Sequence, residues 1–233
     1  MLELREVSLR FGPVQVLDKV DFRLEPGECV GVLGASGAGK SSLLKMAAGL
    51  LPATQGACVN SFRHALLVFQ EPRLLPWRRT QENVEIPLIA SGVPRTEARE
   101  RALHWLSRVG LASSARAWPR ELSGGMAQRA ALARAFALQP DLLLLDEPFS
   151  ALDSALRTDL ARLCAECARD TGAAMLCISH HPEELAGMVE RCVLIADGKL
   201  SGHGFAPSRN SPAPYSALAA ASCISIEKEA QPS

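Results

Sequence analysis

Polar and apolar residues alternate along the first two dozen positions of the chain, which is the period of a β-strand with one buried face. Turn-forming residues break this pattern at 12–13 and again at 25–28, so it divides into two runs. We therefore expect a pair of strands over 2–11 and 14–24 that leads into a third strand. The apolar positions of the pattern are Leu2, Leu4, Val16, Val20, Phe22 and Leu24.

The third run, 29–33, is continuously apolar, as a buried parallel strand is. It ends at a glycine-rich loop, and a helix-forming run follows over 40–50. The second half of the chain alternates in the same way between helical patterns and apolar strands, which favours an α/β fold with a mainly parallel sheet. We expect helices at 123–138, 154–170 and 182–188, and strands at 141–145, 173–178 and 191–196.

The middle of the chain interrupts this alternation. Two short strand-like runs, 57–60 and 65–69, precede two helical patterns at about 80–90 and 96–109, with no strand between the helices. We expect these helices to form an insertion outside the main sheet. From about position 206 the chain becomes rich in Ala, Ser and Pro with few large apolar residues, which is typical of a poorly ordered tail over 206–233.

The charge balance narrows the classes of partner. The 233 residues include 25 Lys plus Arg and 25 Asp plus Glu, so the formal net charge is zero. Because no excess of positive charge is available to release counterions from phosphates, we expect no nucleic-acid partner. With 48% hydrophobic residues, the composition is that of a folded globular chain and excludes disorder of the whole.

Cysteine usage and the apolar runs predict the compartment. The seven cysteines are an odd number, and they lack a regular disulfide spacing, which favours a reducing environment. The N-terminal residues do not show the basic-then-apolar pattern of a signal peptide, and no apolar run approaches the length needed to cross a bilayer. We expect a cytosolic chain that reaches a membrane only through a partner.

The strongest chemical signal is a phosphate-binding loop. Residues 34–41 match G-x-x-x-x-G-K-[ST] between a predicted strand and a predicted helix, the context that this motif requires. Its glycines let backbone N–H groups turn toward phosphates, Lys40 reaches the terminal phosphates, and the Ser41 hydroxyl can ligate Mg²⁺. The residues assigned to nucleotide binding here are Gly34, Ala35, Ser36, Gly37, Ala38, Gly39, Lys40, Ser41 and Ser42.

Two carboxylates follow a buried strand. The apolar run 142–145 ends in Asp146 and Glu147, and α/β folds place their sites at the carboxyl edge of the sheet. We expect Asp146 to orient the metal through water. Glu147 points elsewhere and is the candidate for the base that takes a proton from the attacking water, so the pair separates metal holding from base catalysis.

A third motif carries a family resemblance. Residues 122–129 read Leu-Ser-Gly-Gly-Met-Ala-Gln-Arg, and Ser123 as N-cap followed by Gly124 and Gly125 predicts a helix whose first N–H groups form a second phosphate site. Here the sequence strongly resembles the nucleotide-binding subunits of ABC (ATP-binding cassette) transporters, whose signature begins LSGG. The resemblance covers about residues 2–200.

This resemblance implies a fold and its division. It is the P-loop NTPase fold of the ABC ATPase type, with a mainly parallel sheet core, an N-terminal antiparallel β subdomain and a helical insertion subdomain. We expect one nucleotide-binding domain over 1–205, with the helical subdomain at about 78–135.

The resemblance also implies a dimer. In the family, the signature of one subunit lies against the γ-phosphate held by the phosphate loop of another, so two ATP molecules are enclosed between head-to-tail subunits. We therefore expect ATP with Mg²⁺ and a second copy of the chain as partners. Asp153, in the segment 150–153, matches the loop that crosses this dimer interface.

Three further residues match family positions. Gln70 matches the glutamine that touches Mg²⁺ and the attacking water. His180 matches the switch histidine, which contacts the γ-phosphate and aligns Glu147 and water, although His181 next to it departs from the acidic residue more usual there. Phe11 matches the aromatic residue that stacks on adenine, but it also fits the apolar face of its own strand.

The segment 70–77, followed by Glu82-Asn83-Val84, resembles the importers of the nitrate, sulfonate and taurine group. This implies an integral-membrane permease, an extracytoplasmic solute-binding protein as indirect partner, and a peripheral place at the cytoplasmic face of the inner membrane. Two alternatives stay open, a soluble ABC ATPase not tied to transport and a nucleotide-binding regulatory module that does not hydrolyse ATP. The single cassette disfavours the first, and the intact catalytic positions disfavour the second.

Overall fold

The computed structural model describes residues 1–150 and 152–201. The predicted tail, the predicted domain end at 205 and Ala151 lie outside the described residues. The strands are β1 (Leu2–Phe11), β2 (Val14–Leu24), β3 (Cys29–Leu33), β4 (Gln55–Asn60), β5 (Ala65–Val68), β6 (Leu142–Asp146), β7 (Ala174–Ser179), β8 (Arg191–Ala196) and β9 (Lys199–Ser201). The helices are α1 (Lys40–Ala47), α2 (Thr80–Ala90), α3 (Arg95–Arg108), α4 (Gly124–Ala137), α5 (Ser154–Thr171) and α6 (Pro182–Leu185), with short 3-10 helices at Ala112–Ser114 and Pro119–Glu121.

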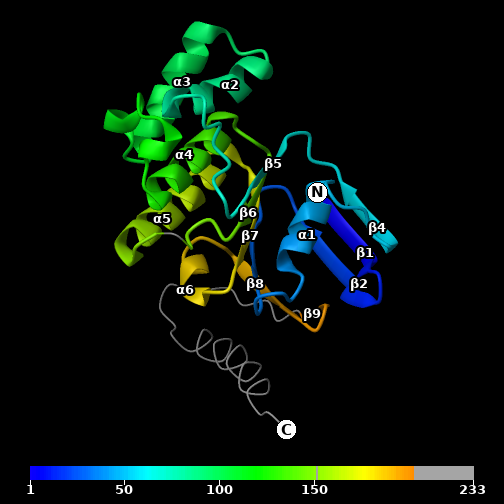
Figure 1. Cartoon of the computed structure of the whole chain (residues 1–233). Helices are drawn as coiled ribbons and strands as arrows, with labels where there is room; N and C mark the ends of the chain where they lie inside the picture. The colour runs from blue at the N-terminus through cyan, green and yellow to red at the C-terminus, as the bar shows by residue number, and fades with distance from the viewer. Residues whose placement is uncertain (151, 202–233) are drawn as a thin grey trace.

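The strands form two separate sheets (Figure 1). The first is antiparallel in the order β2-β1-β4. The second has six strands in the order β5-β6-β7-β3-β8-β9, in which only β9 runs antiparallel to its neighbour. The expected N-terminal antiparallel part and mainly parallel core are both present.

The short strand β5 takes part in the parallel sheet and not in the antiparallel one. It lies beside β6, with Leu66 opposite Leu143 and Val68 opposite Leu145. The sequence pattern predicted a strand here without indicating its sheet. The pairing matters for function because Gln70 follows β5 closely, and parallel pairing brings it to the edge of the sheet where β6 ends in Asp146.

Helix α1 lies between the two sheets (Figure 1), and its apolar residues join them into one core. Leu43, Leu44 and Met46 are buried together with apolar residues of β1, β2 and one face of β3, β6 and β7. Burial of that face at alternate strand positions fixes the register of the parallel strands, because a slip of one residue would exchange the two faces. The start of α1, and with it the phosphate loop, is held in place by this core.

The opposite face of the parallel sheet is covered by the other helices. Helices α4, α5 and α6 pack their apolar residues there, and α2 and α3 pack on α4 beyond the edge of the sheet (Figure 1). The predicted helical insertion is thus observed, with α4 as its link to the core. Among residues 1–150 and 152–201, no helix is both long enough and apolar enough to span a bilayer.

Gly31, in the middle of β3, offers a test of this packing. A β-carbon built at Gly31 lies 2.6 Å from Leu185 Cδ1, 2.9 Å from Cys192 Sγ and 3.3 Å from Val189 Cγ2. We expect Gly31→Val to lower the free energy of unfolding by about 1–3 kcal/mol, because overfilling a packed core forces its neighbours to move. Urea unfolding measures this. Ala57→Val on the exposed face of β4 is the control, and equal midpoints for the two variants would argue against the packing described.

Candidate active site

The predicted site residues meet at the carboxyl edge of the parallel sheet. Strands β6, β7 and β3 are neighbours, and each ends at this edge. The segments that follow them carry Glu147, His180 and the phosphate loop 34–39. Open α/β sheets place ligands in this position, and here strand order brings together residues that are more than 100 positions apart in the sequence.

The phosphate loop curls around the side chain of its own lysine. Lys40 is 5% exposed, and its Nζ donates hydrogen bonds to the carbonyl oxygens of Gly34 and Ala35, each at 2.8 Å. Burial lowers the pKa of Lys40, while the carboxylates of Glu147 and Asp146 oppose this shift. Gly39 has φ +100° and lies against Val16 and Leu17 of β2, so only glycine fits at this point of the loop.

Asp146 and Ser41 place a carboxylate oxygen and a hydroxyl oxygen next to each other beside this loop. Ser41 Oγ donates to Asp146 Oδ1 at 3.1 Å. Burial raises the pKa of the Asp146 carboxyl, and the Ser41 hydrogen bond opposes that shift. A carboxylate and a hydroxyl next to a phosphate site are the donors that Mg²⁺ takes together with nucleotide phosphates. The residues present therefore fit the expected ion, with Ser41 as direct ligand and Asp146 next to it.

Glu147 is the centre of the polar cluster. Its Oε2 lies 3.1 Å from His180 Nδ1 and 3.5 Å from Gln70 Nε2, and its Oε1 lies 4.0 Å from Lys40 Nζ. The side chain is 16% exposed, so it is partly shielded but reachable by water. The structure thus brings together Lys40, Gln70, Glu147 and His180 around one carboxylate.

The backbone at Glu147 explains how two consecutive acids face different ways. Glu147 has φ +45°, a left-handed conformation that non-glycine residues rarely adopt. Its N–H donates to the carbonyl of Ile178 in β7 at 3.1 Å, so the strained residue is held against the neighbouring strand. Strain of this kind is concentrated at functional sites. The two side chains have different partners, Ser41 for Asp146 and His180 for Glu147.

The signature segment occupies another place in the chain. Ser123 is the N-cap of α4, and its Oγ accepts a hydrogen bond from Met126 N at 3.2 Å. Gly124, in the exposed first turn, has no neighbour within 4 Å of a β-carbon built on it. Within the part of the chain that the structure describes, no hydrogen bond or ion pair joins Ser123, Gly124 or Gly125 to the phosphate loop. The described residues of one chain therefore show no direct link between the signature and the phosphate loop.

Helix α4 is attached to the loop that carries Gln70, a connection that the sequence pattern did not indicate. Gln128, 2% exposed, donates from Nε2 to the carbonyl of Phe69 at 3.4 Å. Arg134 donates to the carbonyls of Pro72 and Arg73, both at 2.9 Å. The one feature of the sequence that could have indicated this connection is a polar residue, Gln128, on the apolar side of a predicted helix.

Phe11 and Asp153 each lie at the end of a secondary-structure element. Phe11 is 52% exposed at the end of β1, so it is not part of the buried core. Its stacking on adenine stays a prediction. Asp153 caps α5, its Oδ1 accepting from Leu156 N at 2.9 Å. Of the segment 150–153, Ala151 lies outside the described residues.

The sequence of this chain matches a known protein family. The profile described as ABC transporter matches residues 17–150, which include the phosphate loop, the signature and the carboxylate pair. The chain belongs to the ABC transporter family. The predicted family, the P-loop fold of the ABC ATPase type, ATP binding and ATPase activity are confirmed by this match and by the relatives below.

Two named relatives indicate which group of ABC transporters this chain resembles. It is 44% identical over 200 residues to the aliphatic sulfonates import ATP-binding protein SsuB 2 of Paracoccus denitrificans, an alignment that covers 86% of this chain and 79% of the relative. It is 45% identical over 203 residues to the aliphatic sulfonates import ATP-binding protein SsuB of Mycobacterium sp., with coverage of 86% and 82%. The predicted resemblance to the nitrate, sulfonate and taurine group is confirmed.

Solved structures agree with the fold of this ABC ATPase. The dimeric structure of a post-hydrolysis state of the ATP-binding cassette MJ0796, bound to ADP and Pi, superposes with a TM-score of 0.79 at 30% identity, covering 88% of this chain and all of that one. A second dimeric MJ0796 structure, of a bacterial ABC transporter cassette, gives 0.80 at 29% identity with the same coverage.

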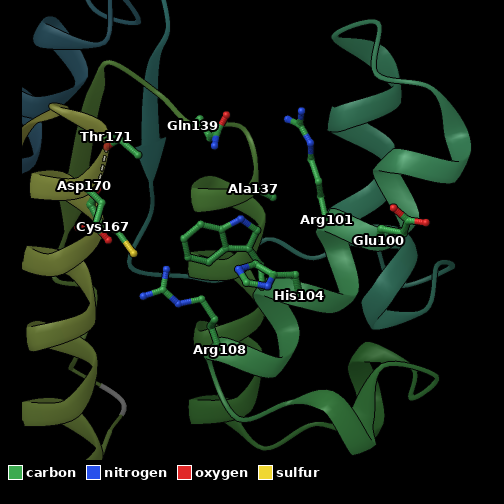
Figure 2. Close-up of a pocket in the computed structure, with 10 residues that line it drawn as sticks. Glu100, Arg101, His104, Arg108, Ala137, Gln139, Cys167, Asp170 and Thr171 are labelled. Atoms are coloured by element: carbon green, nitrogen blue, oxygen red, sulfur yellow. Dashed lines mark hydrogen bonds between the residues drawn. The ribbon is translucent and has the colours of Figure 1, made fainter.

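One sizeable cavity of this ABC protein lies elsewhere. It has a volume of about 540 Å³ and opens between α3, the end of α4 and the end of α5 (Figure 2). Arg101, His104 and Arg108 reach into it from α3, and Cys167 and Asp170 face them from α5. It contains none of the predicted site residues, so the size of a hollow does not locate the catalytic centre here.

Proposed function

We propose that the chain is the ATP-hydrolysing subunit of an importer for aliphatic sulfonates, acting as a homodimer on an integral-membrane permease. One observation carries the hydrolytic part: His180 Nδ1, Gln70 Nε2 and Lys40 Nζ converge on the Glu147 carboxylate at 3.1, 3.5 and 4.0 Å. The sulfonate group rests on relatives at 44–45% identity that carry that activity in their names.

In this proposal the phosphate loop binds the nucleotide. Backbone N–H groups of residues 34–42 and the start of α1 surround the phosphates, and Lys40 exchanges its carbonyl partners for terminal phosphate oxygens. Ser41 holds Mg²⁺, with Asp146 beside it, and the bound ion supplies neutralisation of phosphate charge. Phe11, exposed at the end of β1, provides a ring on which adenine can stack.

Glu147 takes a proton from the attacking water as that water approaches the γ-phosphate. His180 holds the carboxylate from one side and contacts the γ-phosphate, and Gln70 orients the water and senses the metal. Because all three sit on segments held by neighbouring strands, their relative positions are set before nucleotide binds. Such pre-organisation accounts for much of phosphoryl-transfer catalysis.

The signature supplies the reason for a dimer. Ser123 and Gly124 are exposed at the start of α4 and Gly125 is partly exposed, and in the described part of the chain no hydrogen bond joins them to the phosphate loop. A second copy placed head to tail brings each signature to the other's γ-phosphate, with Asp153 near the interface. ATP then shifts the equilibrium toward the closed dimer because only that state makes these contacts. Hydrolysis reopens it.

The proposal divides the chain into functional regions. The domain spans 1–205, and within it the region of about 78–135 is the helical subdomain that receives the permease, next to the loop 70–77. Trp77 is 67% exposed at that loop. The chain would then lie peripherally at the cytoplasmic face of the inner membrane, and a solute-binding protein would reach it only through the permease. The two alternatives, a soluble ABC ATPase and a module without hydrolysis, are not favoured by the relatives' names.

The direct test is co-purification with the membrane. Tagged chain is isolated from detergent-solubilised membranes of its own source, partners are identified by mass spectrometry, and ATPase activity of the eluate is measured for wild type and Glu147→Gln. A multi-span permease with activity lost in the variant is the expected result, and uptake of an alkanesulfonate in intact cells should fail in the same variant. Recovery of ribosomes, DNA or no membrane protein would overturn the transport part of the proposal.

A further inference from the structure

A pair formed by a buried carboxylate and a partly buried arginine has no part in the chemistry described so far. Glu184, in α6, is only 2% exposed, and its Oε1 lies 3.4 Å from Nε of Arg157 in α5. A carboxylate removed from water is strongly destabilising unless it is paired and hydrogen-bonded. Among the described residues neither Arg157 Nε nor Glu184 Oε1 has a hydrogen-bond partner, so these two atoms interact only as an ion pair. The other polar atoms of the two side chains make the hydrogen bonds, and those hydrogen bonds lead to the active site.

On one side the pair holds the residue that precedes the switch histidine. Glu184 Oε2 accepts a hydrogen bond from Ser179 Oγ at 2.6 Å, and Ser179 is fully buried. The same Oγ accepts from the N–H of His181 at 2.9 Å. The backbone on both sides of His180 is thus tied to one hydroxyl, and that hydroxyl is held by Glu184.

On the other side the pair holds the segment that leads away from Glu147. Arg157 Nη2 donates to the carbonyl of Leu152 at 3.1 Å. That segment is a tight turn, in which the Glu147 carbonyl accepts from Ser150 N at 3.4 Å and from Ser150 Oγ at 3.1 Å. Leu152 N donates in turn to the carbonyl of Phe149 at 3.0 Å. Arg157 is therefore connected through Leu152 to the turn that follows Glu147.

We infer that Arg157 and Glu184 are a positioning pair that links the segments on either side of the active site and so keeps His180 aligned on Glu147. The inference deepens the proposed function, because it rests on the proposed roles of those two residues. Two apolar side chains of the same size could fill the space. They could not hold both the Ser179 hydroxyl and the Leu152 carbonyl, and those two contacts reach the site.

Nothing in the sequence separates Glu184 from Glu183, which precedes it. Glu183 is exposed and lies 3.5 Å from His181 Nδ1, whereas Glu184 faces the interior. The short helix α6, which begins at Pro182, decides which of the two turns inward. Only the tertiary arrangement therefore identifies the positioning residue.

The test uses four single variants of the full chain and the double variant of Arg157→Met with Glu184→Gln. Arg157→Met removes the positive charge and the hydrogen-bond donors of the guanidinium group. Glu184→Gln removes the negative charge but keeps the shape of the side chain and one hydrogen-bond acceptor. Arg157→Lys keeps the positive charge but loses the planar guanidinium group with its several donors. Arg162→Met, on the same helix in an exposed pair with Asp159, is the matched control. Steady-state ATP hydrolysis gives kcat and KM, and thermal unfolding reports the folded fraction.

Arg157→Met and Glu184→Gln are expected to lower kcat by roughly 10- to 100-fold, the range for loss of groups that orient a catalytic residue. KM for ATP should stay nearly unchanged, because no phosphate contact is lost. Arg157→Lys should recover part of kcat, and Arg162→Met should equal wild type. If the two single losses act through one link, the double variant should be no worse than the poorer single variant.

The inference is overturned if folded Arg157→Met has the kcat of wild type. It is also overturned if the variant is thermally less stable while kcat per folded molecule is unchanged, because the pair is then purely structural. If Arg157→Met does not fold, kcat of the milder variant Glu184→Gln distinguishes a positioning role from a purely structural one in the same way. Failure of the proposed function is recognised separately. It shows as retained hydrolysis in Glu147→Gln, whereas failure of the positioning role shows as hydrolysis that depends on Glu147 and not on Arg157.

Discussion

Replacement of Glu147 by Gln is expected to stop steady-state ATP hydrolysis while ATP binding persists. The amide keeps the size of the side chain and its contacts with His180 and Gln70, but it cannot take a proton from water. Loss of a general base lowers the rate by about 10²- to 10⁴-fold. Phosphate release under saturating ATP measures this loss, and nucleotide binding measured separately should remain close to wild type.

The same variant should accumulate as an ATP-bound dimer. In the proposed cycle hydrolysis reopens the closed state, so a subunit that binds ATP without hydrolysing it stays closed. Light scattering coupled to size exclusion, with and without ATP, detects the change from monomer to dimer. Glu100→Gln makes the same chemical change at an exposed position in the cavity of Figure 2, and it should hydrolyse normally. A variant at Glu147 that stays monomeric with ATP and hydrolyses normally would refute both the base assignment and the dimer.

Replacement of Lys40 by Ala should instead act on nucleotide affinity. The ammonium group is buried and already placed among the loop carbonyls of Gly34 and Ala35, so its loss removes a charge-assisted contact to phosphate together with two hydrogen bonds within the loop. Such a contact contributes about 1.5–3 kcal/mol, equivalent to a roughly 10- to 150-fold weaker Kd for ATP. Titration calorimetry or fluorescence of a labelled nucleotide measures it.

Lys45 offers a matched control for this second experiment. It lies on the same helix α1, five residues further on, and is exposed. Lys45→Ala removes the same charge, which also acts on Asp146, but it removes no hydrogen bond of the phosphate loop. It should therefore weaken Kd far less than Lys40→Ala does. Unchanged ATP affinity in Lys40→Ala would count against the phosphate-loop role, and equal losses in the two variants would show that net charge alone is responsible.

The sequence by itself determined the motifs that are contiguous in the chain. The phosphate loop at 34–41, the buried strand that ends in Asp146 and the helix capped by Ser123 each depend on a few consecutive residues. Their glycines, caps and apolar runs act on local backbone conformation, which neighbours along the chain control. The resemblance carried by the LSGG signature then predicted the family, and the comparisons confirm it.

Only the tertiary structure decided how those motifs meet. The strand order places β7 between β6 and β3, and this brings His180 to within 3.1 Å of Glu147, although the sequence leaves their separation open. It also put β5 beside β6, left Phe11 exposed and turned Glu184 rather than Glu183 inward. These outcomes depend on packing between segments far apart in the chain, and such packing has no signature in the local pattern of residues.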